Sequence, residues 1–198
     1  MLNKWMLLFV ILLVFGFALI YSFWPSENLL PKLGEMESFT METVEEEQYD
    51  LSNSKVKLVM FYYTSCPDIC PLTMMHATPM QEELMKKNVF GKKVEFVSIT
   101  LDPDVDTKEK IMHYAESFDA DFTGWKWLRG SNEKTKSVAD RFKMMYEKSK
   151  DGFVAHNTTM YLLDKKNNIR AIYDMSTTKE PLDSEQILKD IGKLIEKE

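Results

Sequence analysis

Residues 56–71 read VKLVMFYYTSCPDICP. Val56 to Tyr63 is a continuous apolar and aromatic run, which is typical of a β-strand buried on both faces. The chain then passes through Thr64 and Ser65 into the motif CPDIC, residues 66–70, near which we expect a helix to begin. A buried strand followed at once by a helix predicts an α/β fold with this motif at the carboxyl end of a strand.

The rest of the chain alternates between strand and helix patterns. Asp106 and Glu109 are spaced as a capping box for the second helix, and the turn-rich residues 164–168 predict an antiparallel hairpin. The expected helices cover residues 70–87, 106–118, 133–146 and 184–197, and the further strands cover 94–101, 125–128, 159–163 and 169–173. This order predicts a thioredoxin-like domain over residues 56–198, with a mixed central sheet flanked by helices.

The N-terminal segment from Trp5 to Trp24 carries no charge. It has roughly the 20 apolar residues that cross a bilayer, so we expect residues 1–24 to be a transmembrane anchor. A cleaved signal peptide is the rival interpretation, but no small-x-small cleavage site follows the apolar run. Because Lys4 precedes the apolar run, we expect the N-terminus to be cytoplasmic. This predicts a single-pass protein of the cell membrane whose soluble domain is extracytoplasmic.

Residues 25–55 are polar and acidic and include Glu45-Glu46-Glu47. We expect an acidic linker here, with a short hairpin that leads into the domain. The whole chain has a net charge of −6 at pH 7, which argues against a nucleic-acid partner because such proteins need a basic face. A monomer is expected, although the sequence does not settle the oligomeric state.

The two cysteines of the chain, Cys66 and Cys70, lie within five residues of each other. A disulfide between them closes almost no loop and would contribute little stability, so their proximity indicates chemistry instead. The partial positive charge of a helix N-terminus favours the thiolate form of Cys66. At i and i+4 on one helical turn, the two sulfurs can converge on a soft ion, which leaves Cu(I), Zn(II) and iron–sulfur sites open.

A third ligand must come from another part of the chain, and geometry ranks the three histidines. His76 lies ten residues beyond Cys66, about 15 Å along a helix, and His113 lies within an amphipathic helix. His156 precedes the strand at residues 159–163, in a loop that faces the cysteine turn in the thioredoxin arrangement. His156 is therefore the expected third ligand, and Met74, four residues after Cys70, is expected to be core.

These residues resemble the Sco/SenC family of copper chaperones, which serve the dinuclear copper A centre of cytochrome c oxidase. The resemblance runs from Val56 to the C-terminus and includes YYT before the motif, the motif itself, LDP at 101–103, DT at 106–107, and His156 before YLLD at 161–164. It implies that Cys66, Cys70 and His156 bind copper, as Cu(I) or Cu(II), for the oxidase subunit with the copper A site.

Two positions depart from the family pattern. Tyr62 stands where many members have glycine. Ala155 stands where many members have aspartate before the histidine, which leaves open what orients the His156 ring.

Three functions remain in competition. The leading hypothesis is a non-enzymatic copper carrier, whose Cys66 and Cys70 could also form a redox-switching disulfide. The alternative is a thiol–disulfide oxidoreductase that reduces the cysteines of the oxidase copper site. The wide cysteine spacing and the expected role of His156 argue against it. A peroxidase is a third and weaker hypothesis, because that chemistry does not need a second cysteine at i+4.

Overall fold

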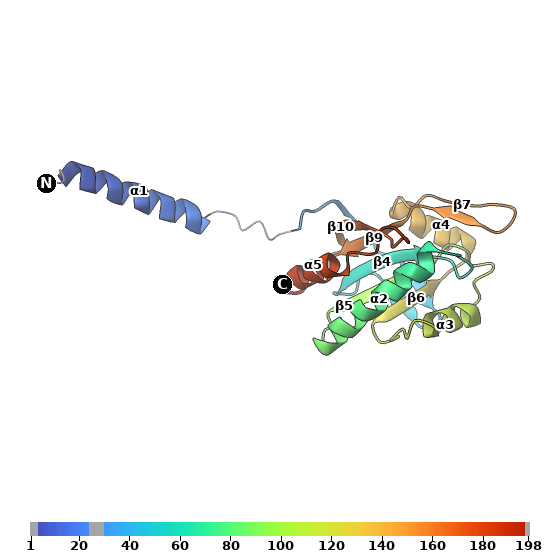
Figure 1. Ribbon diagram of the computed structural model, residues 1–198. Helices are drawn as coiled ribbons and strands as arrows, with labels where there is room; N and C mark the ends of the chain where they lie inside the picture. The colour runs from blue at the N-terminus through green and yellow to red at the C-terminus, as the bar shows by residue number, and fades with distance from the viewer. Residues whose placement is uncertain (1–3, 24–29, 197–198) are drawn as a thin grey trace.

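The structure is a computed structural model that describes residues 4–23 and 30–196 (Figure 1). Its elements in chain order are α1 (Lys4–Phe23), β1 (Gly34–Glu35), β2 (Thr40–Thr43), β3 (Gln48–Asp50), β4 (Val56–Tyr62), α2 (Ile69–Lys86), β5 (Val94–Thr100), α3 (Lys108–Glu116), β6 (Trp125–Arg129), α4 (Asn132–Arg141), β7 (Tyr146–Lys148), β8 (Val154–His156), β9 (Thr159–Leu163), β10 (Asn168–Asp174) and α5 (Ser184–Glu196).

A mixed eight-stranded sheet forms the centre of the domain, in the order β1-β10-β9-β4-β5-β6-β2-β3. β4 pairs in parallel with β5, and both strands are buried along their whole length. β9 and β10 form the antiparallel hairpin that the turn-rich link predicts. The apolar run that begins at Val56 is therefore the predicted central strand, and the predicted α/β, thioredoxin-like fold is confirmed.

Helices cover both faces of this sheet. Successive residues of a strand point to opposite faces, so neighbouring residues of β4 contact different helices. The Phe61 ring lies 5.4 Å from that of Phe142, at the end of α4, whereas the Tyr62 ring stacks 5.7 Å from that of Tyr114 in α3. α2 and α5 lie side by side in front of the sheet in Figure 1. The central strands are fully enclosed, so side chains that are to reach a ligand lie at the ends of these strands.

Strands from residues 34–50 join the same sheet. β2 and β3 form an antiparallel hairpin, β2 pairs with β6, and β1 pairs with β10 at the other edge. The segment that was expected to be an acidic linker with a hairpin thus contributes three strands. Its acidic residues Glu42 and Glu46 both pair with Lys108 of α3, at 3.0 Å.

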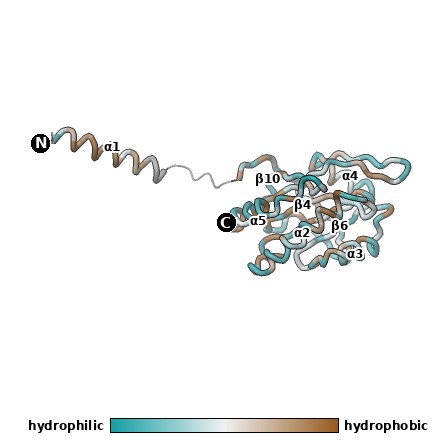
Figure 2. Tube along the Cα trace, viewed as in Figure 1, coloured by the Kyte–Doolittle hydropathy of each residue, from teal (hydrophilic) through white to brown (hydrophobic). Residues whose placement is uncertain are grey.

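The N-terminal helix α1 exposes large apolar side chains from Trp5 to Leu19, which Figure 2 shows as a largely hydrophobic tube. Across the residues that the structure describes, no helix is both long enough and apolar enough to cross a membrane. Residues 1–3 and Trp24, at the ends of the expected anchor, lie outside the described residues.

Two helix boundaries differ from the prediction. The N-cap of α3 is Thr107, whose side chain accepts a hydrogen bond from the Lys110 N–H, so the predicted cap at Asp106 is wrong. Asp106 is instead fully buried. α4 ends at Arg141 rather than at residue 146, because Lys143 adopts a left-handed conformation (φ 54°) and the chain then enters β7.

Candidate metal centre

The two cysteines lie at the carboxyl end of β4, where the chain turns into α2. The spacing of the two cysteines predicted that they share one helical turn. This is wrong, because α2 begins at Ile69 and Cys66 precedes the helix. The Cys70 N–H nevertheless donates a hydrogen bond to the Cys66 Sγ at 3.4 Å. Since the N-cap Asp68 makes no side-chain capping bond, the sulfur takes up an N–H at the helix N-terminus.

This environment separates the protonation of the two thiols. A hydrogen bond from the Cys70 thiol, together with the backbone N–H groups of Asp68 and Cys70, lowers the pKa of Cys66 to about 5. The same contact to Cys66, together with burial, raises the pKa of Cys70 far above its ordinary value. Both cysteines are free, with Cys66 half-buried and Cys70 fully buried. At neutral pH the site therefore holds one thiolate and one thiol.

The imidazole of His156 lies beside these sulfurs, as the sequence predicts. Its Nε2 is 3.9 Å from the Cys70 Sγ. Its Nδ1 is 2.7 Å from the carbonyl oxygen of Asn157, an acceptor, so Nδ1 donates that hydrogen bond and Nε2 is the nitrogen that faces the sulfur. The Asn157 carbonyl thus orients the ring, a role that the sequence left open at Ala155.

The other side chains considered from the sequence lie elsewhere. His76 bonds through Nδ1 to the Ser176 hydroxyl at 2.7 Å, and His113 is exposed on α3. Met74 is fully buried in the core, as expected. The structure therefore brings Cys66, Cys70 and His156 together and keeps the other two histidines away.

A hairpin made of β7 and β8 carries His156 and is fastened to the sheet. Lys148 of β7 donates a hydrogen bond of 2.6 Å to Asp102, whose buried side chain lies just beyond β5. Tyr146 pairs with His156 across the hairpin. The position of the imidazole therefore depends on a contact between two segments that are 46 residues apart.

The site opens into a cavity of about 400 Å³. The lining residues are Tyr63, Cys66, Pro67, Asp68, Ile69, Phe153, Val154, Ala155, His156 and Thr158. The Tyr63 ring lies edge-on to both the His156 ring, at 6.2 Å, and the Phe153 ring, at 6.4 Å. A mostly apolar wall around a few soft donor atoms suits a ligand site that limits access of water.

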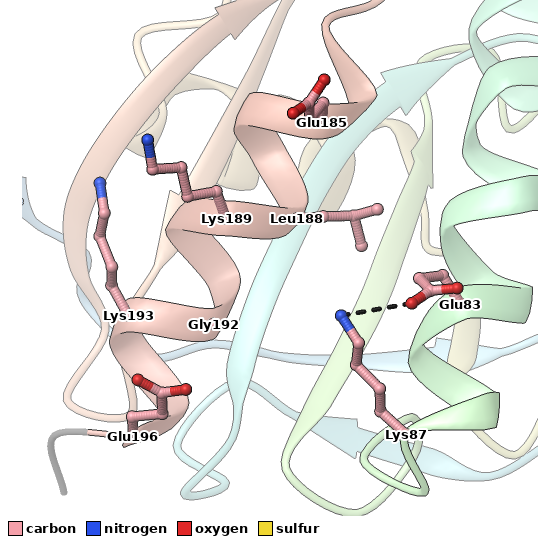
Figure 3. A pocket seen from close by; sticks show the side chains of 8 residues that line it. All are labelled: Glu83, Lys87, Glu185, Leu188, Lys189, Gly192, Lys193 and Glu196. Carbon is pink, nitrogen blue, oxygen red and sulfur yellow. Dashed lines mark ion pairs between the residues drawn. The ribbon is translucent and has the colours of Figure 1, made fainter.

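The groove in Figure 3 is larger, at about 670 Å³, but has a different character. It lies between α2 and α5 and is lined mainly by charged residues, among them the ion pair of Lys87 and Glu83 at 3.3 Å. Lys87 lies about 25 Å from Cys70 at the rise of an α-helix. We assign it no part in the site.

The sequence did not reveal the polar support beneath the cysteine turn. The buried Asp106 carboxylate accepts hydrogen bonds from the N–H and hydroxyl of Thr64 and from the hydroxyl of Thr100. Burial raises its pKa, against these hydrogen bonds. The spacing of Asp106 and Glu109 predicted that Asp106 caps a helix. The sequence near Asp106 gives no sign of its hydrogen bonds to the distant Thr64.

The donor atoms fit a soft metal ion in kind, since two thiol sulfurs and an imidazole nitrogen are ligands for copper or zinc. In residues 4–23 and 30–196, however, no group of three or more His, Cys, Asp or Glu side chains is arranged so that it could hold a metal ion. The three donors are thus gathered but do not form a complete ligand set as they stand.

Comparison with known proteins identifies the family. The SCO1/SenC family model matches residues 35–196, which is most of the chain and all of the site. The chain belongs to the SCO1/SenC family. The predicted resemblance is therefore confirmed, and the match begins at the first strand of the sheet.

Individual SCO1/SenC relatives agree with this assignment. A SCO2-like protein of Rickettsia conorii is 30% identical over 141 residues, which cover 68% of this chain and 66% of that protein. A SCO2-like protein of Rickettsia prowazekii is matched over 57% of its length. The chain thus spans a little over half to two thirds of these relatives.

Two solved structures share the fold. A SCO1/SenC family lipoprotein from Bacillus anthracis has a TM-score of 0.76 and 25% identity, and the match covers 85% of this chain and 99% of that one. Arabidopsis thaliana ScoI, whose structure has copper bound, has a TM-score of 0.66 and 27% identity, and the match covers 79% of this chain and 98% of that one.

Proposed function

We propose that this SCO1/SenC protein binds copper through Cys66, Cys70 and His156 and carries it as cargo to another protein. The observation that supports this most strongly is the 3.9 Å separation of the His156 Nε2 from the Cys70 Sγ. Bonds from a metal of this kind to sulfur and nitrogen are about 2.3 and 2.1 Å long. Their sum exceeds 3.9 Å, so one ion can contact both atoms without backbone movement.

Thiolate and imidazole ligands suit copper or zinc, and the protonation of the two thiols indicates how such an ion would enter the site. Cys66 is already ionised at neutral pH, because its pKa is lowered to about 5. Cys70 holds its proton in the hydrogen bond to Cys66, and copper would replace that proton when it binds. The side chain of half-buried Cys66 would have to rotate to complete the ligand set. The copper bound to the Arabidopsis relative supports the same choice of metal.

The proposed recipient is the cytochrome c oxidase subunit that carries the dinuclear copper A site. The resemblance of the motif residues to chaperones for that centre supports this choice. The half-buried Cys66 and the cavity of about 400 Å³ give an incoming ligand access to the ion. A carrier needs such access, because its cargo must leave by ligand exchange.

We further propose that the N-terminal helix tethers the domain to the extracytoplasmic face of the cell membrane. α1 has 20 residues, and its large side chains from Trp5 to Leu19 are exposed and apolar. Such a face is covered by lipid or by protein, since water solvates it poorly. A tether would keep the carrier at the membrane in which the oxidase resides.

Metal analysis of single variants tests the copper proposal. The full chain is purified without oxygen in detergent, loaded with Cu(I), freed of excess metal and analysed for copper per chain. We expect one copper in the wild type and a large loss in Cys66→Ala, Cys70→Ala and His156→Ala. His113→Ala removes an exposed histidine on α3 and serves as the matched control. Undiminished copper in all three site variants would exclude this site.

A further inference from the structure

The fully buried carboxylate of Asp106 lies behind the cysteine turn. Both of its oxygens accept a hydrogen bond from the Thr64 N–H at 3.2 Å, and hydroxyls of Thr64 and Thr100 donate to it as well. Within the described part of the chain, no ion pair includes Asp106. A buried carboxylate that is held by neutral donors alone is costly, so its retention calls for a reason.

Asp106 is itself fixed to the sheet. Its N–H donates to the Asp102 carbonyl at 2.8 Å, and its own carbonyl accepts from the Arg129 Nε at 2.8 Å. The Arg129 guanidinium also bonds to the Pro103 carbonyl. The carboxylate is therefore a rigid point, anchored to the ends of β5 and β6, to which a flexible turn can be attached.

Thr64 links this point to the thiols. It lies two residues before Cys66, in a turn that the Cys66 N–H closes on the Tyr63 carbonyl at 3.2 Å. The Cys66 Sγ then receives the Cys70 N–H at 3.4 Å. Whatever fixes the backbone of Thr64 therefore fixes the direction in which Cys66 leaves the turn.

We propose that Asp106 is a positioning residue for the copper site, which holds Thr64 and thereby keeps the Cys66 sulfur beside Cys70, where a shared ion can reach it. This inference rests on the proposed copper binding. Groups that orient metal ligands typically contribute 10- to 100-fold to metal affinity. Asp106 acts on the metal only through Thr64 and the turn.

A purely structural role predicts a different result, and the chain offers a matched control. Glu95 is a second buried carboxylate, at the opposite end of β5, and it accepts a hydrogen bond of 2.6 Å from the Tyr49 hydroxyl. Thr64→Val and Tyr49→Phe each remove one hydroxyl donor from a buried carboxylate. If both contacts are only structural, both variants lose stability and neither loses copper affinity.

The experiment compares full-length wild type, Thr64→Val, Thr64→Ser and Tyr49→Phe. Copper(I) affinity is measured by competition with a chromophoric Cu(I) chelator, and the urea midpoint of each variant is recorded. We expect Thr64→Val to lose about 10-fold in affinity, Thr64→Ser to restore it, and Tyr49→Phe to keep it despite a similar fall in midpoint.

The outcomes separate the two proposals. Wild-type affinity in Thr64→Val, or an equal loss in Tyr49→Phe, would overturn the positioning role and leave copper binding intact. A wild-type chain that takes no Cu(I) from the chelator would instead overturn the proposed function, and this inference with it. The Thr64 variants avoid changing the buried charge, so all of these chains are expected to fold.

Discussion

A buried carboxylate lies near each end of β5, Glu95 at the amino end and Asp106 beyond the carboxyl end. The two carboxylates differ in the charge of their hydrogen-bond donors. At the amino end, Glu95 is satisfied by the Tyr49 hydroxyl, the Asn53 amide at 2.7 Å and the Lys55 ammonium at 3.1 Å. Next to it, the buried Lys57 donates to Asn167 at 2.8 Å, and burial lowers the pKa of Lys57 to about 8. Charge is compensated by charge at this end.

At the carboxyl end, polar groups are left incompletely paired. Asp106 has only neutral donors, and the buried hydroxyls of Tyr62 and Tyr114 have no hydrogen-bond partner, whereas at the amino end the Asn53 amide oxygen is unpaired. The thiols of Cys66 and Cys70 are free. We infer that the amino end stabilises the sheet, whereas the carboxyl end keeps donor atoms available for a ligand at some cost in stability.

Glu95→Ala is the most severe test of this contrast. It leaves the buried Lys57 without a nearby negative charge and the Tyr49 hydroxyl without its acceptor, so we expect a loss of about 3–5 kcal/mol in the free energy of unfolding. Urea denaturation measures that loss, and metal analysis of the folded fraction should still find wild-type copper. Loss of copper from folded Glu95→Ala would show that the two ends are not separate.

The reactivity of Cys66 at different pH values tests the carboxyl end of the sheet. Because the pKa of Cys66 is lowered to about 5, the rate of its alkylation by iodoacetamide should rise through about pH 5 and level off above it. Cys70, buried and with a raised pKa, should remain unmodified across that range. An alkylation midpoint near 8.5, the value of a free cysteine, would contradict the proposed thiolate.

The lowered pKa of Cys66 also makes the free energy of unfolding depend on pH. A thiol whose pKa is lower in the folded than in the unfolded chain stabilises the fold above about pH 8.5, and this contribution is lost as the pH falls through about 5. The free energy difference between wild type and Cys66→Ala should therefore grow from pH 5 towards pH 8.5. Urea denaturation at several pH values measures it, and a difference that does not change would argue against the shift.

Lys148→Met gives the smallest expected effect. The ion pair with Asp102 holds the hairpin that carries His156, and partly exposed pairs contribute about 0.2–1 kcal/mol. We expect little change in global stability but faster hydrogen exchange at the amides of β7 and β8. Lys136→Met removes the exposed pair with Asp140 on α4 and is the control. Equal exchange in the two variants would mean that Lys148 does not fasten the hairpin.

The central fold was predictable because its signals are local. Val56 to Tyr62 is buried on both faces, and its sequence is apolar or aromatic apart from Lys57. The turn-rich link at 164–168 predicts the β9–β10 hairpin. The end of α4 was not predictable, because no glycine or proline marks Arg141. Its stop depends on the left-handed residue Lys143 and on the pairing of β7 with β8, which the sequence around it does not reveal.

Some residues of the site were likewise predictable from the sequence and others were not. The sequence alone brought Cys66, Cys70 and His156 together, because the thiols follow a buried strand and the histidine precedes another. It missed the ring-orienting carbonyl of Asn157, since a backbone acceptor has no sequence signature. It also misplaced Asp106, because Asp106 and Thr107 are both plausible helix caps and only tertiary burial decides between them.

X-ray absorption at the copper edge of the loaded full chain identifies the atoms that are bound to the ion. The proposed copper site predicts two sulfur ligands and one imidazole nitrogen in the wild type, and loss of the imidazole contribution in His156→Ala. A copper environment with sulfur alone, unchanged when His156 is replaced, would contradict it.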